Sequence, residues 1–125
     1  MAKKTDIMFD RYGLLPRNNP PDDKGPPKDE QVQWCIRWLR KFAEPRKTIN
    51  TNRSSYGLKH DVESWTKEFP EGRQYIPNGA FIAAALAEGY RVVPVAPNNI
   101  NAHFNIRLLK TPKADVIDIN TRTYR

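Results

Sequence analysis

The residues best suited to chemistry gather near the middle of the chain, where positions 51–60 read Thr-Asn-Arg-Ser-Ser-Tyr-Gly-Leu-Lys-His. The apolar spacing that follows predicts a helix start here. Such a start presents free backbone N–H groups and the positive end of the helix dipole. An anion, phosphate above all, binds well at such a place. A plain cap by Ser54 or Ser55 is the alternative, and it needs no cations.

The charge distribution favours an acidic partner. The chain has a net charge of +7, and residues 31–60 hold seven cations against Glu44 alone, a net +6. A cationic block inside a folded region favours nucleic acid first and an acidic protein surface second. We predict nucleic-acid contacts from eight residues: Arg46, Lys47, Arg53, Ser54, Ser55, Lys59, His60 and Arg107.

Two tryptophans add a second candidate surface. Trp34 and Trp38 lie one helical turn apart, beside the apolar stripe of a predicted helix. Together with the neighbouring arginines and lysine they would form a stacking and cationic surface. The alternative is that both indoles widen the core face of that helix.

The residue types needed for catalysis and metal binding are scarce. His60, His103 and Cys35 have no recognised metal-ligand spacing. Neither a phosphate-binding glycine loop nor a Gly-x-Ser-x-Gly elbow occurs. The two histidines would suit the acid and base of a metal-independent nuclease, but surface or capping roles are the commoner use. We therefore predict no catalytic residue, no metal, no cofactor and no enzymatic activity.

Three helices are predicted to position these residues. The first runs from Asp29 to about Ala43 and stops at Glu44-Pro45, because the residue before a proline avoids helical geometry. A basic polar linker over 45–54 leads to a second helix over 55–68. The third, over 79–88, has Asn78 as its cap and Gly89 as its C-terminal glycine. Because it is rich in alanine and begins at Gly79, another backbone can approach it closely, and we expect it to be central.

Two strands follow, over 90–96 and 103–109, with a loop between them. In the second strand apolar and polar residues alternate, as in a half-buried strand. The order of elements predicts an α+β fold, three helices followed by a β-hairpin, in the manner of a winged helix-turn-helix. The third helix of that fold reads the major groove, and here it is almost neutral. Architecture and recognition chemistry therefore disagree.

The predicted domain spans residues 29–109 and is flanked by two tails. Residues 1–28 hold five of the eleven prolines and are predicted to be a disordered arm. Residues 110–125 form a basic C-terminal tail. With no apolar run of about 18 residues, no apolar signal segment and a single cysteine, Cys35, the chain is expected to be cytoplasmic and without membrane contact.

Two stretches, 55–60 (Ser-Tyr-Gly-Leu-Lys-His) and 75–85 (Tyr-Ile-Pro-Asn-Gly-Ala-Phe-Ile-Ala-Ala-Ala), resemble small uncharacterised proteins of phages, prophages and plasmids. The resemblance covers roughly residues 45–105. It implies a mobile-element origin and transfers no catalytic residue. The predicted function is that of a small basic nucleic-acid-binding accessory protein. The alternative is a protein that binds and modulates, or inhibits, a host or phage nucleic-acid machine.

Overall fold

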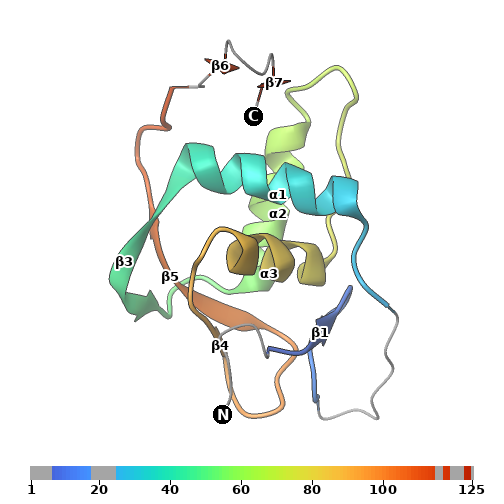
Figure 1. The fold of residues 1–125 in the computed structure, drawn as a ribbon, viewed down its shortest axis with the longest axis vertical. Coiled ribbons are helices and arrows are strands. Elements are labelled where there is room, and N and C mark those ends of the chain that lie inside the picture. Colours follow the sequence, from blue (N-terminus) through green and yellow to red (C-terminus); the bar gives the residue numbers. More distant parts are fainter. Residues whose placement is uncertain (1–6, 18–24, 115–116, 119–122, 125) are drawn as a thin grey trace.

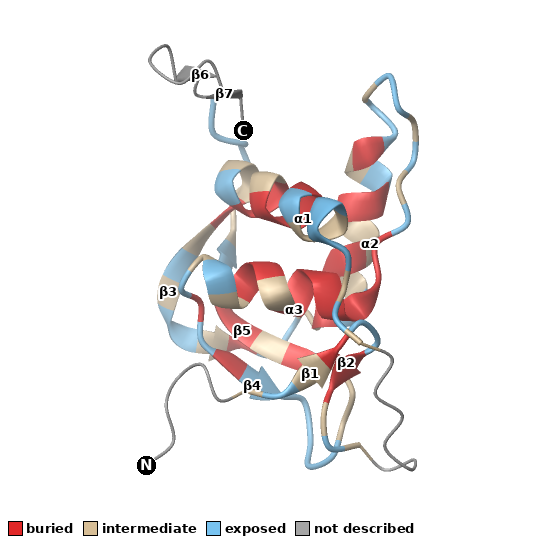
Figure 2. Ribbon diagram, turned by 45° about the vertical axis from the view of Figure 1, so that its right-hand side comes forward, coloured by how far each residue is buried: buried red, intermediate tan, exposed pale blue. Residues whose placement is uncertain are grey.

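The computed structural model describes residues 7–17, 25–114, 117–118 and 123–124. Its central sheet has three antiparallel strands in the order β3-β5-β4. Three helices pack with this sheet, and Figure 2 shows α3 between α1 and the strands β4 and β5. The main elements in chain order are α1 (Asp29–Phe42), β3 (Ala43–Asn50), α2 (Ser55–Thr66), α3 (Asn78–Ala87), β4 (Val92–Pro94) and β5 (Ala102–Leu108).

The predicted α+β class with three helices is confirmed, but the predicted order of elements is wrong. Strand β3 begins at Ala43, at the end of α1, and takes up most of the segment expected to be a linker before α2; Figure 1 shows it beside β5. β3 pairs with β5 through Ala43–Leu108 and Pro45–Ile106, and the register shifts after Pro45. A proline is tolerated there because β3 is an edge strand, where a missing N–H leaves no ladder partner unsatisfied.

Helix α3 is the most buried helix, as its composition predicts. Seven of its ten residues are buried, and they appear red in Figure 2. The ring of Phe81 lies edge-on to Trp38 of α1 at 5.8 Å and to Phe104 of β5 at 5.4 Å. These edge-to-face contacts join α1, α3 and the sheet into one core.

Part of the predicted disordered arm is ordered against α3. Residues 7–17 contain the short strands β1 (Phe9–Asp10) and β2 (Gly13–Leu14), which pair with each other. Asp10 is fully buried, accepts hydrogen bonds from the amides of Tyr12 and Gly13, and pairs with Arg17 at 2.5 Å. The arm prediction for residues 1–6 and 18–24 lies outside the described residues.

The predicted C-terminal tail follows β5, and its first residues contact the end of α1. The amide of Lys113 donates to the carbonyl of Lys41 at 2.8 Å. Further on, β6 (Ile117–Asp118) pairs with β7 (Thr123–Tyr124). The rest of the tail lies outside the described residues.

Candidate functional site

The two hydroxyls at the start of α2 serve the fold. Ser54 is the N-cap, and its Oγ accepts a hydrogen bond from the amide of Gly57 at 3.4 Å. Ser55 is fully buried, and its Oγ accepts from the amide of Ala102 at 3.0 Å, which ties α2 to β5. The capping interpretation therefore describes Ser54. Ser55, predicted as a nucleic-acid contact, is instead a buried structural link.

The cations of this region are paired with acids on the next turns of α2. The Nη2 of Arg53 lies 2.5 Å from Oδ2 of Asp61. Lys59 is buried, with its Nζ 3.3 Å from Oε2 of Glu63. Arg53 and Lys59 are therefore poor ligands for a phosphate at the helix start, because each already forms an ion pair with a carboxylate.

Glu63 is the centre of a charged cluster that we call the Glu63 cluster: Glu63, Lys59, His60 and Arg73. The carboxylate is 1% exposed, and its Oε1 accepts from Nδ1 of His60 and Nη2 of Arg73, each at 3.0 Å. Its Oε2 also accepts from the amide of Ile76 at 2.8 Å. Burial alone would raise the pKa of Glu63, but the Ile76 amide and the Lys59 charge outweigh it and hold that pKa below its ordinary value. Glu63 therefore stays ionised and fixes three basic side chains.

Two exposed tyrosines flank this cluster. Tyr56, on the first turn of α2, is 53% exposed, and Tyr75, in the loop before α3, is 58% exposed. The Lys59 Nζ lies 5.3 Å from the centroid of each ring. The Tyr56 ring also meets the His60 ring edge-on at 4.6 Å. Neither tyrosine was among the predicted site residues, since neither falls on a periodic or cationic pattern.

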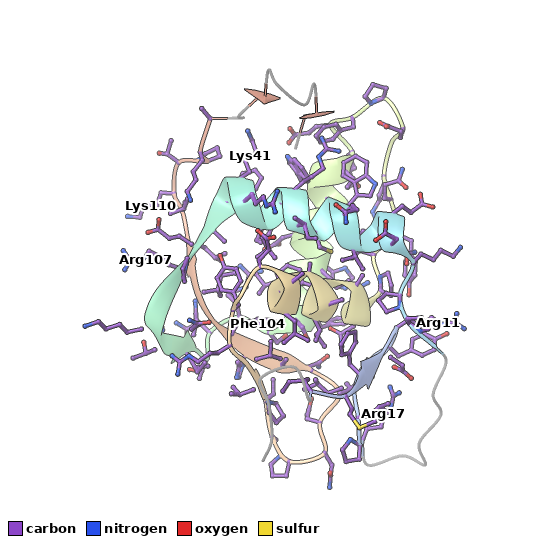
Figure 3. All side chains as sticks on the ribbon, in the orientation of Figure 1. Arg11, Arg17, Lys41, Phe104, Arg107 and Lys110 are labelled. Atoms are coloured by element: carbon purple, nitrogen blue, oxygen red, sulfur yellow. The ribbon has the colours of Figure 1, made fainter. Side chains whose placement is uncertain are left out.

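A second cationic region lies on strands β3 and β5 and at the residue just before β4, and we call it the basic surface: Arg46, Lys47, Arg91 and Arg107. Phe104 and Ile106 of β5 are fully buried, so Arg107 projects to the opposite face of the sheet. Figure 3 shows Arg107 and Lys110 on one side of the molecule, away from Arg11 and Arg17.

Asn105 fastens the basic surface together. It is buried, although it lies on the outward-facing register of β5. Its Nδ2 donates to the carbonyl of Arg46 at 3.0 Å, and its Oδ1 accepts from the amide of Arg91 at 2.7 Å. The Arg91 guanidinium in turn donates to the carbonyl of Lys47. One asparagine side chain thus fixes the spacing between β3 and the residue just before β4.

Most of the charge on the basic surface is poorly compensated. Arg107 is 61% exposed at its side chain and lies 3.7 Å from Glu44, a loose and exposed pair that contributes little. Lys47 and Arg91 are exposed. The Arg46 guanidinium donates to the carbonyls of Thr48 and Ile49, which carry no formal charge. The positive charge of Arg46 therefore stays available to an anion.

The predicted stacking surface on α1 is wrong. Trp34 and Trp38 are both buried. Trp34 packs edge-on against Trp65 and Phe69, at 5.9 and 5.0 Å, and Arg37 covers its face at 4.6 Å. The alternative interpretation holds, because α1 packs against α2 on one side and α3 on the other, and so buries a stripe wider than one row of residues.

No family model, curated protein or solved structure matches the chain. The resemblance to small proteins of mobile elements stays a prediction. Within the described residues, His, Cys, Asp and Glu side chains do not gather in threes as metal ligands would. None of the described helices is both long and apolar enough to cross a membrane.

Proposed function

We propose that this protein binds nucleic acid through the basic surface, as a small cytoplasmic accessory protein without enzymatic activity. The observation that carries the proposal is the basic surface itself, in which Asn105 ties the backbone of Arg46 on β3 to that of Arg91 just before β4. Within strands β3, β4 and β5 the one acidic residue is Glu44. Cations presented in this way neutralise phosphates, and the counterions released on binding make the affinity depend on salt.

The topology supports a winged-helix classification. The element order is α1-β3-α2-α3-β4-β5, so three helices precede the β4–β5 hairpin as in that class, with β3 added after α1 and paired with β5 in the sheet order β3-β5-β4. In winged helices of the usual kind, the third helix reads base edges. Here α3 is buried and its start is covered by residues 7–17, so we assign the contact to the strands instead. A mobile-element origin, which the resemblance of residues 45–105 implies, is part of the same proposal.

Binding should be measured with duplex DNA, single-stranded DNA and RNA over a series of salt concentrations. The test variant is Lys47→Ala/Arg107→Ala. Its matched control is Lys28→Ala/Lys67→Ala, which removes the same charge at exposed positions outside the basic surface. Each lost phosphate contact lowers the slope of log affinity against log salt by about 1. We expect the slope to fall by about 2 in the test variant and to stay near the parent value in the control.

If the slope of log affinity against log salt is the same in the test variant and the control, nucleic acid contacts a surface other than the basic surface. An affinity for nucleic acid that ignores salt would remove the proposal, because counterion release would then play no part.

A protein partner is the second candidate, and a different surface favours it. Residues 92–102 carry no charge, and β4 is an edge strand of the sheet. Val93 and Val95 there are 37% and 39% exposed. An exposed apolar edge strand is a template for pairing with another chain. Such a protein would modulate a host or phage nucleic-acid machine.

Capture of partners from host lysate, with and without nuclease, separates the two candidates. Under the first, captured proteins disappear after nuclease treatment, and Val93→Lys has no effect. Under the second, a partner survives nuclease and is lost in Val93→Lys, while Lys47→Ala/Arg107→Ala retains it.

A further inference from the structure

We propose that Tyr56 and Tyr75 form a stacking platform for unpaired bases of single-stranded nucleic acid, with Arg73 and His60 contacting its backbone. This inference rests on the proposed nucleic-acid binding and extends it to a second site and a strand type. The site is made by α2 and the loop before α3, whereas the basic surface is made by the strands and Arg91.

The two tyrosine rings are held open to solvent by the residues beneath them. The Nζ of the buried Lys59 lies 5.3 Å from both ring centroids, so its ammonium attracts both rings. Lys59 itself is held in place by Glu63. The rings remain more than half exposed, so each can present a face or an edge to a ligand.

The Glu63 cluster carries an excess of positive charge close to those rings. Lys59 and Arg73 contribute two positive charges against the single carboxylate of Glu63. The Arg73 side chain is 52% exposed and that of His60 is 44% exposed, so both reach solvent while anchored to Glu63. A carboxylate that anchors cations in this way spares a ligand the entropy of ordering them.

An exposed aromatic pair beside anchored cations suits single-stranded nucleic acid. Base–aromatic stacking needs an unpaired base, whereas the bases of a duplex are stacked on one another inside the helix. Stacking tolerates any sequence, because every base has a π face. An acidic peptide would use the cations but would gain much less from the two rings.

The test compares three probes of equal length: oligo-dT, an abasic phosphodiester strand and a DNA duplex. The variants are Tyr56→Ala and Tyr75→Ala, with Tyr56→Phe and Tyr75→Phe as controls that keep the ring.

Stacking on an aromatic side chain is worth about tenfold in affinity for each base. We expect either alanine variant to bind oligo-dT about tenfold more weakly. Both should bind the abasic strand and the duplex as the parent does, and both phenylalanine variants should behave as the parent. Thermal melts of all four variants confirm that the fold is retained.

The outcomes separate this inference from the proposed function. If the alanine variants bind oligo-dT as the parent does while Lys47→Ala/Arg107→Ala loses it, the platform is overturned and the proposed function stands. If the parent binds none of the three probes, the platform is overturned, and if it binds no RNA either, the proposed function falls as well. If the tyrosines are needed instead for binding a poly-glutamate peptide, the surface belongs to a protein partner, and the inference is wrong.

Discussion

The backbone of Asp10 lies directly against Gly79: a Cβ atom added at Gly79 would stand 2.0 Å from the carbonyl oxygen of Asp10. The amide of Gly79 also donates to the carbonyl of Arg11 at 2.9 Å. At Gly79 the N-terminal hairpin therefore meets the start of α3 through direct backbone contact. The prediction that a neighbouring backbone lies against Gly79 is confirmed.

Gly79→Ala should destabilise the fold, although alanine is normally the better helix residue. Its methyl group would collide with backbone atoms of Asp10 and Arg11, which cannot rotate away as a side chain can. We expect a loss of about 1–3 kcal/mol in the free energy of unfolding, and a larger loss for Gly79→Leu. Thermal and denaturant melts measure it.

The control is Gly57→Ala in α2. The nearest atoms to a Cβ at Gly57 belong to the Arg53 side chain, at 3.7 and 3.9 Å, which is ordinary contact. There the gain in helix propensity should dominate, at about 0.5–1 kcal/mol of added stability. A Gly79→Ala protein that melts at or above the parent would mean that the hairpin does not dock on α3.

Asn78→Asp should destabilise the protein, because Asn78 acts as a cross-link rather than as the predicted cap. Pro77 holds the N-cap position. The Asn78 Nδ2 donates to the carbonyls of Tyr12 and Ile100 and to Oδ1 of Asn101, at 3.1, 3.3 and 3.0 Å. Aspartate caps as well as asparagine does but has no such donor, so we expect a loss of about 2 kcal/mol. Unchanged stability would restore the capping role.

The helices were predictable and the first strand of the sheet was not, for a physical reason. Apolar spacing, prolines and glycines mark α1, α2 and α3 within their own sequences. Strand β3 is an edge strand with exposed Pro45, Lys47 and Thr48, so its sequence lacks apolar alternation. Its hydrogen bonds come from β5, some sixty residues away, and no local pattern reports them.

The site was predictable in its charge but not in its pairing. The cationic block over residues 31–60 drew attention to Arg46 and Lys47, which lie on strand β3. It could not distinguish them from Lys59, which forms an ion pair with the buried Glu63. The i, i+4 spacing of Lys59 and Glu63 on a predicted helix indicates an ion pair, so this pairing could have been predicted from the sequence. Tyr75 has no such signal, because its place beside Lys59 depends on the path of the loop.

Glu63→Gln should destabilise the protein at neutral pH and much less in acid. The change leaves Lys59 buried without its counter-charge, which costs about 3 kcal/mol. The pKa of Glu63 is lowered in the folded protein, so its ionisation stabilises the fold above the ordinary value of 4.5. That contribution is lost as the pH falls through the lower folded pKa.

Denaturant unfolding of parent and variant at pH 7 and at progressively lower pH measures this difference. The control is Glu68→Gln, at an exposed position just after α2, which should change stability by less than about 0.5 kcal/mol. A gap between parent and Glu63→Gln that persists unchanged in acid would show that the carboxylate charge is not what stabilises the cluster.

Cys35 should be inert to thiol reagents until the protein unfolds. It is fully buried in α1. Burial, with a smaller effect from the charge of Glu63, raises the pKa of its thiol far above the usual range, so almost no thiolate forms in the native state. The labelling rate should therefore follow the equilibrium constant for opening the fold, and Gly79→Ala should speed it about tenfold for each 1.4 kcal/mol of stability that it loses. The control is Ser64→Cys in a Cys35→Ala background, because Ser64 is exposed on α2 and its thiol should react at the rate of a free peptide. Rapid labelling of Cys35 in the native parent, under conditions where melts show a folded protein, would mean that α1 separates from the core without global unfolding.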